Sequence, residues 1–170
     1  MTAGRTAHSM RISTEAIWGL RAMRKCRAEH YADWAITMLE AGHDSKHLRV
    51  LAGIESKSSV FEAEEYFQQT AAELGLEEPS NESAMKAYCI YVAEQIVERK
   101  VAARDGVTML FLVCMDADYP KNLMIWFHPH DACEDLRYGY EPYSYPGLTK
   151  MNLEETVIKE AMDFVASETK

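Results

Sequence analysis

The sequence predicts a mainly α protein, and two observations carry that prediction. Apolar residues recur at spacings of three and four over several stretches, as they do on the buried side of amphipathic helices. Residues that favour helix ends, with Ser or Asn before a stretch and Gly after it, flank most of these stretches. We therefore expect a single-domain helical bundle, or a short stack of helical pairs, over residues 13–170, with a disordered N-terminus at residues 1–12.

Residues 31–53 are expected to organise the fold as a corner of two helices. Gly42 occupies the place of a left-handed C-terminal cap, and Asp44 or Ser45 can begin the second helix. A lone helical pair cannot bury its apolar face, so other helices must cover this corner. The apolar residues of the two helices are Tyr31, Trp34, Ala35, Met38 and Leu39, followed by Leu48, Leu51 and Ala52.

Further helices are predicted on both sides of this corner, at about 13–27, 59–74 and 82–101 and from Asn152 onward. Nine consecutive uncharged residues, 107–115, suit either a buried helix or a buried strand. We favour the helix; the alternative is a small β-hairpin over 107–128. Residues 131–150 are rich in turn-forming and aromatic residues and are expected to form a long irregular segment.

The charge of the chain argues against a nucleic-acid partner. The formal net charge is −9, from 27 acidic and 18 basic residues. Six basic side chains and a single acid lie in residues 1–28, which leaves −14 on the remainder. Because an acidic body repels phosphate backbones and attracts basic surfaces, we expect no nucleic acid and instead a basic protein partner.

No apolar run approaches the ~18 residues that span a membrane, and the N-terminal stretch lacks the apolar core of a signal peptide. We therefore expect a cytoplasmic protein without membrane association. The four cysteines form no C-x-x-C pair and are predicted to be reduced thiols. The absence of a phosphate-cradling glycine loop and of a dinucleotide fingerprint predicts no cofactor.

Several phrases resemble a family of short, mostly helical bacterial proteins of unknown function. They are DWA-x-x-MLE-x-G-x-DS with LR-x-LAG in residues 33–53, FEAEEYFQQTAAELGL in 61–76, DYP with LM-x-W in 118–126, and EDLRYG in 134–139. The resemblance implies a mostly helical fold and brings no catalytic residues. In type, although not in motif, such small acidic helical proteins are also similar to the immunity proteins that neutralise bacterial toxins.

The best candidate for a metal site is the segment FHPHDACED at 127–135; the weaker candidates, His43 with His47 and Asp116 with Asp118, are more simply surface and helix-end residues. An extended backbone would bring the imidazoles of His128 and His130 together, and Asp131 or Cys133 could add a third ligand. This spacing supports a metal-dependent enzyme as an alternative function. The simpler interpretation is a solvated acidic loop with incidental histidines.

The same region is predicted to bind the basic partner, because tyrosines are favoured anchors at interfaces and carboxylates speed association with a cationic surface. The sequence thus favours a non-catalytic acidic binding protein, most simply an immunity-type inhibitor that occludes a basic partner such as a toxin nuclease. A structural scaffold or oligomer is the third interpretation, and the oligomeric state stays open. The predicted partner-binding residues are Asp131, Glu134, Asp135, Tyr138, Tyr140, Glu141 and Tyr143.

Overall fold

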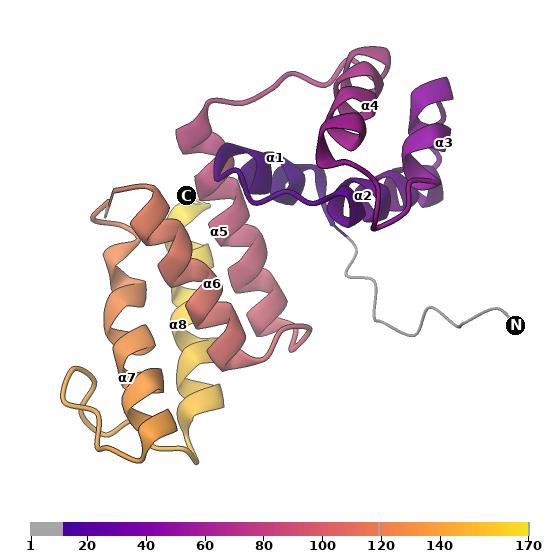
Figure 1. Ribbon diagram of the computed structural model, residues 1–170. Coiled ribbons are helices and arrows are strands. Elements are labelled where there is room, and N and C mark those ends of the chain that lie inside the picture. Colours follow the sequence, from indigo (N-terminus) through magenta and orange to yellow (C-terminus); the bar gives the residue numbers. More distant parts are fainter. Residues whose placement is uncertain (1–11, 119, 170) are drawn as a thin grey trace, which may run out of the picture. The chain divides into compact units, whose positions relative to one another are not determined.

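The computed structural model describes residues 12–118 and 120–169, and all regular structure within those ranges is helical (Figure 1). The prediction of a mainly α fold is confirmed. The elements are α1 (Thr14–Ala22), α2 (Ala28–Glu40), α3 (Lys46–Ala52), α4 (Val60–Glu73), α5 (Asn81–Val97), α6 (Ala103–Asp116), the 3₁₀ turn η1 (Met124–Trp126), α7 (Phe127–Tyr138) and α8 (Leu153–Glu168).

Inside the range predicted as one domain, the chain divides into two compact units, Met1–Ser80 and Asn81–Lys170. Each unit is described by itself below. The predicted disordered N-terminus at residues 1–12 lies outside the described residues except for Ile12, which is buried.

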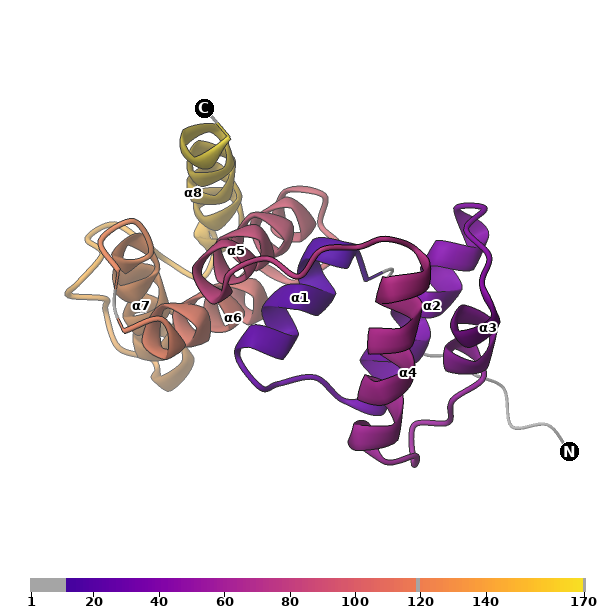
Figure 2. The ribbon, with the colours of Figure 1, turned by 90° about the horizontal axis from the view of Figure 1, so that it is seen from above.

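The first unit is built on the predicted corner of α2 and α3. Gly42, just after α2, has φ +91°, the left-handed conformation that glycine adopts without strain. The Ser45 hydroxyl accepts a hydrogen bond from the Leu48 amide and so caps α3. Helix α4 packs on both α2 and α3, and α1 packs on α2 (Figure 2).

The core of this unit is aromatic. The ring of Phe67 on α4 is fully buried, and its centroid lies 4.8 Å from Trp34, 5.0 Å from Trp18 and 5.2 Å from Tyr31. The indole of Trp34 also donates a hydrogen bond to Thr14 Oγ1 at 3.2 Å, which ties α2 to α1. One phenyl ring thus joins three helices.

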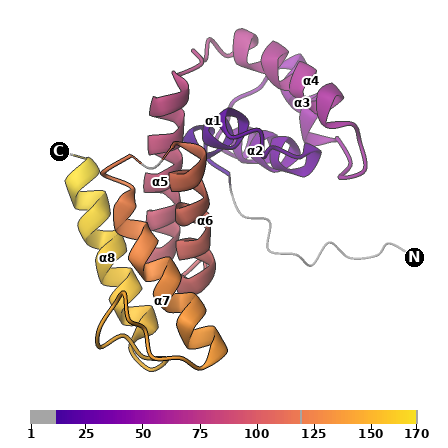
Figure 3. The same ribbon diagram turned by 60° about the vertical axis from the view of Figure 1, so that its left-hand side comes forward.

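The second unit contains α5, α6, α7, η1 and α8. Helix α6 packs on α5, α7 and α8, and α5 makes its most extensive contact with α8 (Figure 3). Its core includes Trp126 of η1, whose indole lies edge-on to Phe164 of α8 with centroids 5.5 Å apart.

The β-hairpin considered for residues 107–128 is wrong, because α6 and η1 occupy that stretch. The uncharged run forms a helix in which Val107, Leu110 and Val113, at helical spacing, make up the buried side. None of the helices in the described part of the chain has the length and apolar character of a membrane span.

A close approach of α5 and α6 constrains Gly106. A Cβ atom at Gly106 would overlap Cγ1 and Cδ1 of Ile96, a β-branched side chain that is only 1% exposed. The two helices can therefore touch only if residue 106 has no side chain.

We expect Gly106→Ala to destabilise the second unit by about 1 to 3 kcal/mol, because the overlap outweighs the gain in helix propensity. Urea unfolding followed by circular dichroism measures the change. In a double-mutant cycle with Ile96→Ala, which removes the overlapping atoms, the alanine at 106 should cost much less. An equal cost in both backgrounds would contradict the close approach.

Candidate functional site

The segment that carries the predicted site residues is helical where the sequence predicted an irregular loop. Helix α7 occupies 127–138 and ends at Gly139, which has φ +85°, so the irregular segment begins only there. Pro129 lies in the first turn, where its missing N–H removes no helical hydrogen bond. With Pro129, the buried residues Ala132, Cys133 and Leu136 form one apolar side of the helix.

This helix separates the two histidines of the predicted metal cluster, so the prediction that they lie together on extended backbone is wrong. Residues two apart on a helix point to different sides. The His130 ring stacks on Phe111 of α6, with centroids 3.9 Å apart and planes within 8°, whereas His128 is exposed.

Asp131 follows His130 closely, with 3.8 Å between His130 Nδ1 and Asp131 Oδ1, which is too long for a hydrogen bond. Within residues 12–118 and 120–169, no group of three or more His, Cys, Asp or Glu side chains is arranged to hold a metal ion.

The acidic and aromatic residues predicted to bind a partner form what we call the α7 surface: Asp131, Glu134, Asp135, Tyr138, Tyr140, Glu141 and Tyr143. Asp131, Asp135 and Tyr138 follow one another at spacings of four and three, so they share a side of α7. Glu134 lies beside them, 3.6 Å from the guanidinium of Arg137.

The tyrosines of the α7 surface are unusually exposed. Tyr138 is 68% exposed, Tyr140 67% and Tyr143 95%. The segment that bears the last two is nevertheless anchored, because Leu148 is buried against α7 and the Tyr145 hydroxyl donates a 2.6 Å hydrogen bond to Glu160 of α8. The chain therefore holds this segment in place while presenting its tyrosines to solvent.

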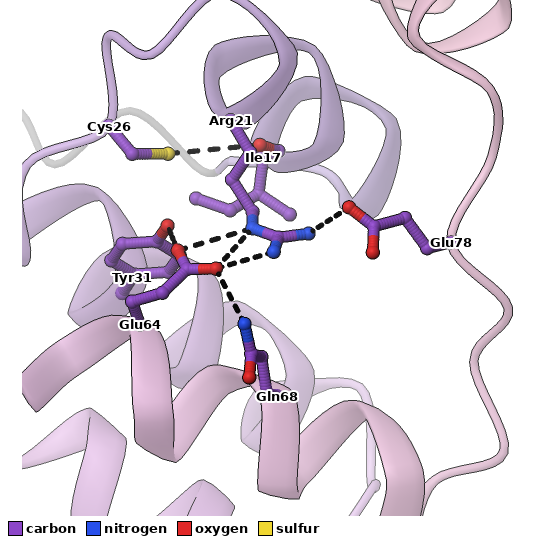
Figure 4. Close-up of polar contacts among 7 residues, drawn as sticks. All are labelled: Ile17, Arg21, Cys26, Tyr31, Glu64, Gln68 and Glu78. Carbon is purple, nitrogen blue, oxygen red and sulfur yellow. Dashed lines mark hydrogen bonds and ion pairs between the residues drawn. The ribbon is translucent and has the colours of Figure 1, made fainter. Parts of the chain in front are cut away.

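A second polar cluster, in the first unit, was not anticipated from the sequence (Figure 4). Arg21 of α1 forms a bidentate contact with the Glu64 carboxylate, and its other side reaches Glu78 at 2.8 Å. Its guanidinium carbon lies 4.7 Å from the ring centroid of Trp18 and 5.0 Å from that of Phe67. Tyr31 and Gln68 also donate hydrogen bonds to Glu64.

The electrostatics of this cluster are those of a satisfied ion pair. Burial opposes ionisation of Glu64, but the hydrogen bonds from Arg21 and Tyr31 outweigh it and hold the pKa of Glu64 below its ordinary value. Burial, with the Cys26 and Glu64 neighbours, raises the pKa of Tyr31 well above its usual range. Burial likewise raises the pKa of Cys26 to about 12. A protonated phenol and a protonated thiol are poor nucleophiles, so the cluster holds α1 on α4 and offers no reactive group.

No protein-family model matches the chain, and no match was found among the curated proteins or the solved structures. The resemblance to a family of short bacterial proteins therefore stays a prediction.

We expect the first unit to lose stability in acid through Glu64. A pKa lowered by folding contributes stability above the ordinary value of 4.5, and that contribution disappears as the pH falls through the folded pKa. Glu64→Gln should lower the free energy of unfolding by about 2 kcal/mol at neutral pH, because charged hydrogen bonds are lost. In this variant the free energy of unfolding should also fall less as the pH is lowered. Urea unfolding by tryptophan fluorescence in a Trp126→Phe background, which leaves Trp18 and Trp34, measures this.

The matched control is Glu65→Gln, which removes the same charge from an exposed neighbour on α4. Some acid dependence should survive in Glu64→Gln, because hydrogen bonds from Ser45 and His47 also lower the pKa of Glu73. Equal unfolding curves for the two variants across the acid range would refute the role given to Glu64.

Proposed function

We propose that this protein is a non-catalytic binding protein that docks a basic protein partner on the α7 surface. The observation that carries the proposal is the exposure of Tyr138, Tyr140 and Tyr143, at 67–95%, within six residues of chain. Exposed aromatic clusters mark interaction sites, because water contact with a large ring is unfavourable unless a partner covers it.

The charges beside these rings indicate the kind of partner. Asp131, Asp135 and Glu141 stand within the same surface, and no ion pair within the described residues involves Asp135 or Glu141. Carboxylates at such a surface accelerate diffusional encounter with a cationic protein and repel an anionic one. Aromatic anchors accompanied by charged residues are the usual components of a specific interface.

Among basic partners, we propose a toxin such as a secreted nuclease, whose cationic substrate groove an acidic inhibitor can occlude. This would make the chain an immunity-type protein, in keeping with its resemblance in type to that class and with its net charge of −9. The four free cysteines, Cys26, Cys89, Cys114 and Cys133, fit a reducing compartment, and we propose that the protein acts in the cytoplasm.

The test is a pull-down with the full chain at low salt, in which proteins encoded by neighbouring genes are co-expressed as candidates. We expect one basic protein to be captured and then released as the salt is raised, because screening weakens the attraction of exposed charges. The combined change of Asp131, Glu134 and Asp135 to alanine should slow its association about tenfold at low salt. Tyr138→Ala with Tyr143→Ala should speed dissociation by a similar factor.

The matched control removes three exposed acids from other helices of the same unit, in the variant Glu94→Ala, Glu155→Ala, Asp163→Ala. Both triple variants lose the same net charge, so a slower association confined to the α7 variant assigns the effect to the surface. Equal association rates for the two would rule out the α7 surface as the docking site.

A further inference from the structure

The second unit contains a pocket that plays no part in the proposed docking surface. It has a volume of about 460 Å³ and lies where α5 ends and where both α6 and α8 begin. These three helix ends lie at the same end of the unit (Figure 3). Small-molecule sites have volumes of this order, roughly 300–1,000 Å³.

The lining of this pocket is cationic in a protein that is otherwise acidic. Arg99, Arg104 and Lys150 line it together with two carboxylates, Asp105 and Glu154. Arg99 forms an ion pair with Glu154, so that carboxylate is already engaged. Among the described residues, no ion pair involves Arg104 or Lys150, and Asp105 is exposed to solvent. The lining therefore has a net charge of +1, and neither of the two cations outside the Arg99–Glu154 pair is held in an ion pair with a described residue.

Arg104 carries a hydrogen-bond donor that no acceptor in the described part of the chain satisfies. Its Nε atom is buried and has no hydrogen-bond partner within the described residues. The Cys133 thiol is near, but burial raises the pKa of Cys133, so the thiol stays protonated and gives Arg104 no negative charge. A buried donor without an acceptor costs free energy. An oxyanion in the pocket would relieve that cost if the Arg104 side chain turned toward it, because the Nε atom is buried as the side chain lies.

The backbone supplies further donors at the same place. Helices α6 and α8 both direct their N-termini to the pocket, and neither N-cap residue, Ala102 or Asn152, uses its side chain to cap its helix. Asn152 instead accepts a hydrogen bond from the Thr149 amide at 2.7 Å. The Leu153 amide of α8 already donates to the Thr149 carbonyl at 3.0 Å, so the backbone contribution comes from the first turn of α6 and from the positive ends of the two helix dipoles.

We propose that this pocket binds a small phosphate monoester. Two free cations and two helix ends suit a dianionic group with three terminal oxygens better than a single carboxylate. The apolar part of the lining, Ile96, Val101 and Leu153, covers an organic group attached to the phosphate. The inference does not depend on the α7 surface or its partner.

The experiment is a titration of the full ¹⁵N-labelled chain, followed by NMR, with phenyl phosphate, inorganic phosphate and phenol in turn. We expect phenyl phosphate to shift the amide signals of residues 103–105 and 153–154 with a Kd on the order of 1 mM or tighter. Inorganic phosphate should shift the same signals at higher concentration, and phenol should leave them in place.

Arg104→Gln and Lys150→Gln should each weaken phenyl phosphate binding by about tenfold, the usual loss when one charged hydrogen bond is removed. Lys150 is exposed, so its variant folds even if the Arg104 variant does not. The matched control is Lys121→Gln, an exposed lysine beyond the far end of α6, which should bind like the original protein.

Three results would overturn the proposal. The first is equal binding of phenol and phenyl phosphate, which would make the pocket a simple apolar hollow. The second is a set of shifts spread over the basic residues of the unit instead of the two helix starts. The third is an equal loss of affinity in the Lys121 and Lys150 variants, which would reduce the effect to net charge.

Discussion

In each unit a buried aromatic ring joins elements that are distant in the sequence. In the first unit this ring is Phe67, which contacts Trp18, Trp34 and Tyr31 from two other helices, and in the second it is Trp126, which contacts Phe164. Short helices are marginal in isolation, so they depend on such shared contacts for their stability. The ring of Phe67 also supports the Arg21 guanidinium, which lies 5.0 Å from its centroid, and thereby joins the apolar core to the ion pair with Glu64.

Local signals were sufficient to predict most helices, because helix periodicity and end residues are properties of neighbouring positions. Ser13, Ser45 and Ser59 all cap the helices that the sequence assigned to them, and Gly42 and Gly75 adopt positive φ after helix ends. Residues 127–138 were misjudged because Pro129 and the clustered charges suggest a loop, although a proline in the first helical turn is compatible with a helix. That one misassignment also removed the geometric basis of the His128–His130 pair.

The features that the sequence could not reveal depend on residues far apart in the chain. Arg21 and Glu64 are 43 residues apart, and nothing local marks either as half of a pair. The phosphate pocket likewise joins residues 96–105 to residues 150–158, and its cationic character is hidden by the acidic composition around it. The composition of the α7 surface could be predicted from the sequence, but its exposure could not, because the partial burial of Tyr145 and the exposure of Tyr143 follow from tertiary contacts alone.

The net negative charge of the protein repels an anionic ligand, whereas the cations of the pocket attract it. At distances beyond about 8 Å at physiological salt the net charge of −9 is largely screened, and within that range it still repels anions. Binding in the pocket must then arise from short contacts with Arg104, Lys150 and the helix ends, which salt screens much less where they are buried. The same acidic field would attract the proposed basic partner to the α7 surface. One charge distribution would therefore favour the approach of a cationic protein over the last few ångströms and admit an anion only in direct contact with the pocket, so the two proposed ligands do not compete for the same electrostatic feature.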